Sequence, residues 1–139
     1  MPSDDSVRAL KRDECIELLK ESSFGRLATA AAGVVDIFPI NYFADGTTIL
    51  LRTAPGTKLL EMMVNETVAF ETDWHGDAEA WSVVVRGRAR LLESQTEIDE
   101  AERAPLRPWI PTLKYRFVRI AIDEVSGRRF RMLPEPERG

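Results

Sequence analysis

Hydrophobic and polar residues alternate with a period of two along much of this chain, which is the pattern of half-buried β-strands. The clearest case is residues 81–92. One face of this segment carries Val83, Val85, Gly87, Ala89 and Leu91, and the other carries Ser82, Val84, Arg86, Arg88 and Arg90. The segment is therefore predicted to be a long strand whose first face lies in the core.

Shorter runs of the same kind predict further strands, which turn residues separate. These strands are expected at residues 24–32, 34–43, 47–53, 67–73 and 114–123, and a turn at Ser126-Gly127 is expected to lead into a final short strand. Asp45-Gly46 is the strongest hairpin signal, because Asp-Gly between β-rich runs favours a tight turn. Residues 74–80 are polar and are expected to form a loop.

Three short helices fit between these strands. The first is expected to begin at Asp13, a good N-cap residue, and to end at Ser22-Ser23. The second covers residues 57–64, and the third covers residues 95–104 after the cap residue Ser94. About six strands joined by hairpins predict a mainly β fold, an antiparallel barrel or highly curved sheet, and not a β-α-β layout.

The length of 139 residues fits one domain, to which residues 10–133 are assigned. The ends of the chain, residues 1–9 and 134–139, are polar or rich in proline and are expected to be flexible. No apolar stretch approaches the roughly 18 residues that a membrane span needs. The N-terminus has no apolar segment of a secretory signal. A cytoplasmic protein without a membrane partner is therefore expected.

Composition removes several classes of function. The 23 acidic residues outnumber the 19 basic ones, and the net charge of −4 argues against nucleic acid as the main partner. Cys15 is the single cysteine and His75 the single histidine, which excludes a disulfide framework and a His-rich or multi-thiolate metal centre. Redox or group-transfer chemistry is therefore expected to come from a cofactor.

The segment from Arg52 to Lys58 is the main candidate site. A predicted strand delivers Arg52 and Thr53, a Pro-Gly turn follows, and Thr57 and Lys58 open a helix. The start of a helix offers free N–H groups to an anion, and the Arg and Lys side chains add positive charge. A solvated strand end beside an ordinary helix is the alternative interpretation.

Other unusual residues have structural alternatives as well. Pro39 predicts an edge or a bulge in its strand, which either shapes a barrel corner or exposes backbone groups to a heterocycle. The arginines on the polar face of residues 81–92 are expected to be solvated or to face another subunit. His75 is expected at the surface, and Cys15 is expected to have a structural role. Three tryptophans are candidates for a lid, an interface or the core: Trp74, Trp81 and Trp109.

Taken in order, several segments resemble the pyridoxamine 5′-phosphate oxidase-like family of FMN-binding split barrels. These segments are residues 24–29, 39–43, 45–46, 52–53, 56–58, 81–89, 118–120 and 126–129. The resemblance covers about residues 10–131, which is nearly the whole chain.

The resemblance implies a six-stranded antiparallel split β-barrel and a homodimer with FMN at the subunit interface. It implies a phosphate clamp that consists of Arg52, Thr53, Thr57 and Lys58. It also implies that a backbone edge meets the isoalloxazine ring at Pro39, Ile40, Asn41 and Tyr42. Ser82 is placed as a polar contact of the ring, and Trp109 is placed to approach the flavin from the other subunit.

The function that this resemblance implies is a flavin-dependent oxidoreductase acting on an unidentified small molecule, with reduced nicotinamide as a candidate electron donor. Two alternatives remain open: a deazaflavin-coenzyme-dependent reductase and a non-catalytic flavin-binding carrier or sensor. The sequence assigns no catalytic residue and no metal ligand. Oxidation of vitamin B6 phosphates is not expected, because the family's C-terminal substrate clamp of Arg and His is missing and no His follows Trp109.

Overall fold

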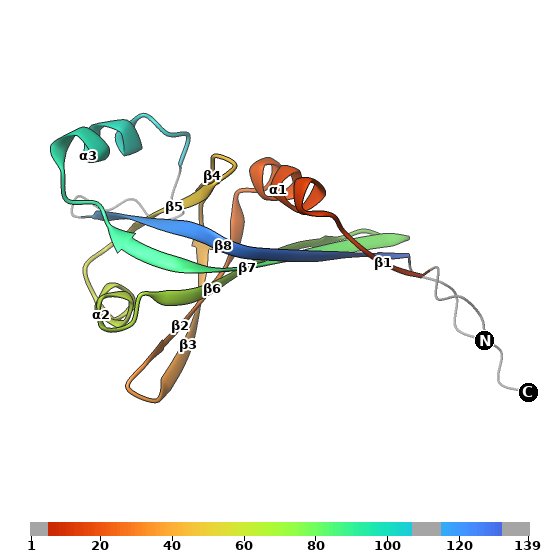
Figure 1. The fold of residues 1–139 in the computed structure, drawn as a ribbon, viewed down its shortest axis with the longest axis horizontal. Helices are drawn as coiled ribbons and strands as arrows, with labels where there is room; N and C mark the ends of the chain where they lie inside the picture. Colours follow the sequence, from red (N-terminus) through yellow and green to blue (C-terminus); the bar gives the residue numbers. More distant parts are fainter. Residues whose placement is uncertain (1–5, 107–114, 132–139) are drawn as a thin grey trace, which may run out of the picture.

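The computed structural model describes residues 6–106 and 115–131, which form one twisted antiparallel sheet with three short helices (Figure 1). The strands are β1 (Val7–Ala9), β2 (Phe24–Ala31), β3 (Val34–Asn41), β4 (Phe43–Ala44), β5 (Thr48–Thr53), β6 (Thr67–His75), β7 (Glu79–Leu91) and β8 (Arg116–Arg131). The helices are α1 (Arg12–Glu21), α2 (Thr57–Val64) and α3 (Gln95–Glu102). None of these helices is long and apolar enough to span a bilayer.

The strands follow the order β3-β2-β6-β7-β8-β5-β4, and β1 pairs with β8. This curled antiparallel sheet confirms the predicted mainly β, split-barrel fold. The described residues contain eight strands where six were expected, because β1 and the two-residue β4 were not foreseen. Figure 1 shows the β2–β3 hairpin projecting away from the long β7–β8 pair.

One face of the sheet forms the main core, and α1 and α2 complete it. The alternation predicted for residues 81–92 is confirmed, since Val83 and Val85 are fully buried while Arg86, Arg88 and Arg90 are exposed. The helices contribute Cys15, Leu18 and Leu19 from α1 and Leu59 and Met62 from α2. Under α3, a second and smaller cluster consists of Leu50, Leu92, Ala101 and Phe117.

Several local predictions are confirmed. Helix α2 covers the predicted residues 57–64. Ser94 caps α3 by accepting a hydrogen bond from the Glu97 N–H at 3.2 Å. The hairpin at Asp45-Gly46 lies between β4 and β5, where the Asp45 carboxylate accepts hydrogen bonds from the Thr48 N–H at 2.8 Å and the Thr47 N–H at 3.0 Å.

Other boundaries differ from the predictions. Helix α1 begins at Arg12 after the cap residue Lys11 rather than at Asp13, because the Glu14 carboxylate accepts the Lys11 N–H at 3.2 Å. Residues 7–9, which were placed in a flexible end, pair with β8 as β1. Helix α3 ends at Glu102, two residues earlier than expected.

The predicted loop at residues 74–80 is mostly strand. Trp74 pairs with Trp81 and His75 with Ala80, so that the turn shrinks to residues 76–78. The β6–β7 pairing therefore extends beyond the core. The polar side chains of this part of the hairpin lie at the surface, so the polar sequence does not prevent strand formation.

The turn predicted at Ser126-Gly127 is wrong, because β8 continues through it. A Cβ atom at Gly127 would lie 2.8 Å from the Cys15 Sγ and 3.0 Å from the Ser82 carbonyl oxygen. This glycine therefore permits close packing of α1 and β7 on β8 and does not mark a turn.

Candidate functional site

The connection from β5 to α2 has the form that the sequence predicted for an anion site. Arg52 and Thr53 end β5, Gly56 precedes the helix, and Thr57 and Lys58 are its first two residues. The first helical hydrogen bond runs from the Leu60 N–H to the Gly56 carbonyl at 3.0 Å, and Gly56 has no side chain to cap the helix. The N–H groups of the first turn are therefore available to an acceptor.

Arg52 is held by an aromatic ring and not by a carboxylate. Its guanidinium carbon lies 4.0 Å from the centroid of the Tyr115 ring. The Tyr115 hydroxyl donates a hydrogen bond to Glu102 at 2.6 Å, which raises the pKa of this tyrosine. Within the described residues, the Nε atom of Arg52 is buried and has no hydrogen-bond partner. The guanidinium is thus oriented by stacking, and part of its donor capacity is unused.

Lys58, the second residue of α2, is also positioned by an aromatic ring, and this ring belongs to the edge strand β3. Its Nζ atom lies 5.3 Å from the centroid of the Phe38 ring in β3. The side chain is half-buried, and burial lowers the pKa of Lys58 below its usual range. A bound anion would oppose this effect, because an opposite charge nearby favours the charged ammonium.

The two threonines of the predicted clamp differ in exposure. Thr53 is buried, and its hydroxyl donates to the Ala54 carbonyl at 3.3 Å. Thr57 is exposed at the first position of α2. The structure thus brings Arg52, Thr57 and Lys58 to one strand–helix junction, where Thr57 and the helix start are open to solvent.

The predicted backbone edge lies on β3, which ends the sheet. Pairing of β3 with β2 is continuous from Phe24–Asn41 to Ala31–Val34, so the bulge proposed at Pro39 is absent from this ladder. A proline is accommodated here because an edge strand does not need every donor. Pro39 is exposed and Asn41 half-buried, whereas the Ile40 side chain belongs to the core.

Tyr42 is used by the fold at both its backbone and its ring. Its N–H donates to the Ser23 carbonyl at 2.9 Å, and its hydroxyl donates to the Leu19 carbonyl at 2.7 Å. The ring packs edge-on against Phe70, with 4.7 Å between the centroids. Burial raises the pKa of Tyr42 to about 12, so the phenol stays neutral.

Ser82 lies on the outer face of β7, opposite Asp73 and Arg128. It lines a groove of about 680 Å³ between β1, β7 and β8. Neither Arg52 nor Lys58 is among the residues that line this groove. Ser82 therefore lies apart from the β5–α2 junction, and Trp109 lies outside the described residues.

A charged cluster on the same outer face was missed by the sequence analysis. One Nη atom of Arg26 in β2 lies 2.9 Å from the Glu71 carboxylate and 3.6 Å from the Asp73 carboxylate, both in β6. Burial and then the Asp73 carboxyl raise the pKa of Glu71 to about 7, although Arg26 opposes this shift. Two acidic residues spaced by two in a strand were the available signal, but the pairing with Arg26 depends on register.

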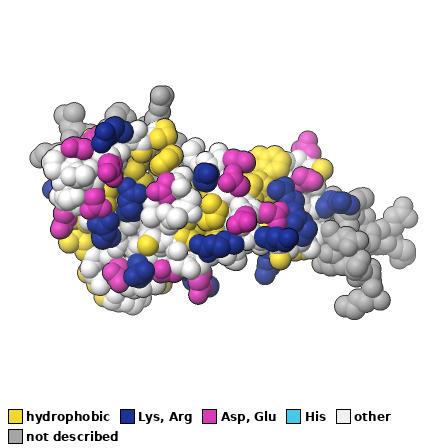
Figure 2. All heavy atoms as spheres, turned by 45° about the horizontal axis from the view of Figure 1, so that its top comes forward, with side chains coloured by type: hydrophobic (Ala, Val, Ile, Leu, Met, Phe, Trp, Pro, Cys, Tyr) yellow, Lys and Arg dark blue, Asp and Glu magenta, His cyan; other side chains and the backbone are white. Residues whose placement is uncertain are grey.

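The arginine stripe on β7 forms ion pairs. Arg88 contacts Asp123 at 3.0 and 3.1 Å, Arg90 contacts Glu97 at 2.6 and 3.1 Å, and Arg86 lies 3.6 Å from Glu124. Figure 2 shows basic and acidic side chains side by side across this view of the molecule, without separation by sign. The stripe is therefore exposed and balanced in charge by acidic partners, which agrees with the expectation of a solvated face.

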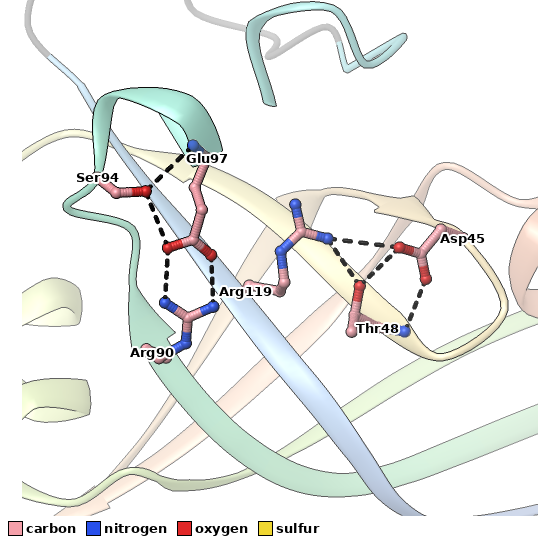
Figure 3. A network of polar contacts seen from close by, with 6 residues as sticks. All are labelled: Asp45, Thr48, Arg90, Ser94, Glu97 and Arg119. Atoms are coloured by element: carbon pink, nitrogen blue, oxygen red, sulfur yellow. Dashed lines mark hydrogen bonds and ion pairs between the residues drawn. The ribbon is translucent and has the colours of Figure 1, made fainter. Parts of the chain in front are cut away.

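A neighbouring network joins the Asp45 turn to β8 (Figure 3). Arg119 donates to the Thr48 hydroxyl at 2.9 Å and lies 3.4 Å from the Asp45 carboxylate. Beside it, Glu97 accepts from both Arg90 and its own cap residue Ser94. These contacts fix the β4–β5 turn and the start of α3, and so have a structural role.

The two remaining candidates, His75 and Cys15, lie outside the β5–α2 junction. His75 is exposed in β6, as expected. Cys15 is buried, and burial raises the pKa of its thiol, which disfavours a reactive thiolate. Among the residues that the structure describes, no group of three His, Cys, Asp or Glu side chains is arranged to hold a metal ion.

Comparisons with known proteins agree with this fold. The family model described as pyridoxamine 5′-phosphate oxidase matches residues 11–129. An uncharacterized protein of Mycobacterium tuberculosis is 50% identical over 93 residues, which are 67% of this chain and 84% of that protein.

Solved structures give the same result. A presumed pyridoxamine 5′-phosphate oxidase from Corynebacterium glutamicum has 42% identity and a TM-score of 0.88, with 96% of this chain and 100% of the other covered. The FAD binding protein from Mycobacterium smegmatis has 42% identity and a TM-score of 0.78, with 90% and 99% covered. A FAD-binding protein from Mesorhizobium loti has 29% identity and a TM-score of 0.75, with 88% and 97% covered. The chain therefore belongs to the pyridoxamine 5′-phosphate oxidase family.

Proposed function

We propose that this protein binds FMN through the junction of β5 and α2 and acts as a flavin-dependent oxidoreductase on a small molecule. The proposal rests on the surroundings of two basic side chains, which contact aromatic rings and no carboxylate of the described residues. Arg52 and Lys58 flank the uncapped start of a helix and are held by the Tyr115 and Phe38 rings. In the described residues neither forms an ion pair with a carboxylate, and Arg52 Nε is an unused buried donor.

This donor set fits a phosphate group. A guanidinium offers a planar fork, an ammonium offers a compact charge, and the first turn of α2 offers backbone N–H groups. The Thr57 hydroxyl adds an exposed donor at the same place. FMN ends in such a phosphate. FAD contains the same ribityl phosphate, so the FAD-binding relatives support this chemistry as well.

The residues of β3 would orient the ring system. Pro39 and Asn41 belong to an edge strand beside Lys58, because Lys58 contacts Phe38 of the same strand. A bound flavin supplies hydride and electron transfer. The protein would contribute binding, orientation and shielding from water. We propose reduced nicotinamide as the electron donor, and we assign no catalytic residue.

We further propose that the protein acts as a homodimer with the flavin between the subunits. Support comes from the position of the predicted contacts. Ser82 lines a groove on β7 and β8, away from the Arg52–Lys58 junction, so a second subunit would have to bring such a groove to the cofactor. Two-fold dimers are also the commonest closed assemblies.

The test is to identify and titrate the cofactor. We expect the purified protein to carry a molecule with a flavin absorption spectrum and the mass of FMN, and the apoprotein to bind FMN more tightly than riboflavin, which lacks the phosphate. Equal affinity for FAD would show that the adenylate is tolerated. Binding and turnover only with a deazaflavin coenzyme would overturn the proposal, and flavin binding without electron transfer from any donor would favour a carrier or sensor.

A further inference from the structure

Three polar side chains meet where α2 lies against the β2–β3 hairpin. Thr29 in β2 and Asp36 in β3 are opposite each other in the strand register. Glu61 of α2 accepts a hydrogen bond from the Thr29 hydroxyl and forms a second one with the Asp36 carboxyl group. Thr29 is only 1% exposed, and the other two side chains are half-buried. Residues that are distant in the sequence therefore come together between a helix and the edge strand.

The contact between Asp36 and Glu61 requires a proton. Ionised carboxylates only accept hydrogen bonds, so two of them can bind each other only when they hold a proton between them. This hydrogen bond raises the pKa of Glu61, and the Thr29 hydroxyl opposes the effect. Loss of the proton leaves two negative charges facing each other, which repel. The contact between α2 and β3 is therefore attractive when the pair is protonated and repulsive when it is not.

The same face of α2 makes two further contacts with the hairpin. Lys58 lies one turn before Glu61, and its Nζ atom is 5.3 Å from the centroid of the Phe38 ring. Phe38 is two residues from Asp36 and lies on the same side of β3. Asn65 lies one turn after Glu61, and its side-chain amide donates to a backbone carbonyl of β2 at 2.8 Å. Glu61 thus occupies the middle of the contact, next to the pair of Lys58 and Phe38.

We propose that Glu61 is a positioning residue of the β5–α2 phosphate site: a proton held between Glu61 and Asp36 fastens α2 to β3 and so fixes Lys58 beside the edge strand. This role rests on the proposed binding of FMN at the junction and adds its regulation by pH. When the proton is lost, repulsion loosens the contact between α2 and β3, and Lys58 is no longer held at one place. FMN then binds more weakly, so its binding takes up protons and its affinity falls as the pH rises through this range.

The surroundings of Glu61 in the described residues make Asp36 its main electrostatic partner. Asp36 faces it from β3, whereas β2 contributes the neutral Thr29. Helix α2 also packs against β7, where Arg90 lines a groove beside the helix and is already paired with a carboxylate of α3. Lys58, on the same helix, is directed to an aromatic ring of β3. The protonation of Glu61 is therefore controlled by the carboxyl group across the gap between α2 and β3.

Replacement of Glu61 by an amide tests the role of the proton. In Glu61→Gln the amide group donates to the Asp36 carboxylate and its oxygen accepts from Thr29, so the contact is retained without a proton. A phosphate monoester such as that of FMN itself titrates near about pH 6. The quantity to measure is therefore the FMN dissociation constant of the wild type divided by that of the variant at each pH. We expect this ratio to rise about tenfold between about pH 5 and pH 8, and Asp36→Asn should give the same profile.

Two further variants and one flavin-free measurement complete the test. Glu66→Gln is the matched control, because it removes the same charge from an exposed residue just beyond α2, and its ratio should not change with pH. Glu61→Ala loses the contact and should bind FMN about tenfold more weakly than Glu61→Gln at every pH. In urea unfolding of the flavin-free protein, the wild type should lose stability relative to Glu61→Gln as the pH rises, because the raised pKa of Glu61 stabilises the fold only while the proton is held.

The possible failures are distinguishable. A ratio for Glu61→Gln that is constant with pH, in a wild type that binds FMN, would overturn the positioning role and leave the phosphate site in place, even if the stability difference follows the pH. An equal change of the ratio in Glu66→Gln would assign the effect to net charge and would also overturn it. A wild type that binds no FMN would overturn the proposed function, and the positioning role with it.

Discussion

Two groups of basic side chains in this protein differ in what holds them. On β7, Arg88 and Arg90 are each bound by one carboxylate through two contacts. At the β5–α2 junction, Arg52 and Lys58 lie against the rings of Tyr115 and Phe38. A carboxylate both orients and neutralises a cation, whereas a ring orients it and leaves most of its charge uncompensated.

This difference separates a structural role from a binding role better than the number of basic residues does. The β7 stripe has three arginines in five residues and is the more conspicuous in the sequence. Its charges are nevertheless balanced by Asp123, Glu97 and Glu124. The less conspicuous pair, Arg52 and Lys58, has no carboxylate partner among the described residues, and it is the pair that we propose to bind the anion.

The largest effect is expected from removing the charge of either junction residue. Arg52→Ala and Lys58→Ala should each weaken FMN binding by about 1.5–3 kcal/mol, roughly tenfold to a hundredfold, because a charge-assisted contact to phosphate is lost. Riboflavin affinity should change little, and added salt should reduce the difference. Fluorescence titration with both ligands measures this. An equal loss for riboflavin would show that the clamp is wrongly assigned.

Tyr42 belongs to the backbone edge that is predicted to meet the isoalloxazine ring, and its hydroxyl tests whether a residue of that edge has a structural role or a binding role. Tyr42→Phe should lower the free energy of unfolding by about 1–3 kcal/mol, because the buried Leu19 carbonyl loses its donor. FMN affinity should stay within about twofold of the wild type, since the hydroxyl belongs to the fold. Urea denaturation and FMN titration of one preparation give both values. A weaker FMN complex with unchanged stability would instead place this hydroxyl at the ligand.

The pH dependence of FMN binding distinguishes Lys58 from an ordinary surface lysine. Burial lowers the pKa of Lys58, so its charge is lost at a lower pH than usual, and binding should weaken as the pH rises through that value. The loss should approach about tenfold. Lys58→Arg is the matched variant and should flatten the profile, because a guanidinium stays charged. An unchanged profile in this variant would exclude Lys58 as the titrating group.

The smallest effects are expected on the β7 stripe. Arg88→Ala and Arg90→Ala should leave FMN affinity within about twofold, because both guanidinium groups already have acidic partners. Exposed ion pairs of this kind typically contribute about 0.2–1 kcal/mol, so thermal unfolding should change only slightly. A large loss of FMN affinity in either variant would remove the distinction between the two groups of cations.

The elements with strong local signals could be predicted from the sequence. The alternation in β7, the Asp-Gly hairpin and the limits of α2 required no knowledge of distant residues. Gly127 could not be interpreted in this way, because its role depends on the approach of Cys15 and Ser82 from other elements. A glycine occurs both in turns and where another element packs closely against the backbone, and the neighbouring sequence does not distinguish these two roles.

The same limit applies to the site. The residues of the β5–α2 junction are close in sequence, and their arrangement was predictable from a strand, a turn and a helix start. The rings that hold Arg52 and Lys58 come from β3 and from the residue before β8. Arg26 and Glu71 are 45 positions apart. Such partners depend on strand register, which a single sequence specifies only through the completed fold.

The pairing of β8 also has a consequence for biosynthesis. This strand pairs with β1, β5 and β7, and its partners include Val7 near the start of the described chain. Until the ribosome has released the residues of β8, three strands lack their common neighbour and keep open edges. Long-range pairing of this kind makes folding slow and exposes unpaired strands on the way. The pairing of these three strands is therefore completed only after all residues of β8 have been translated.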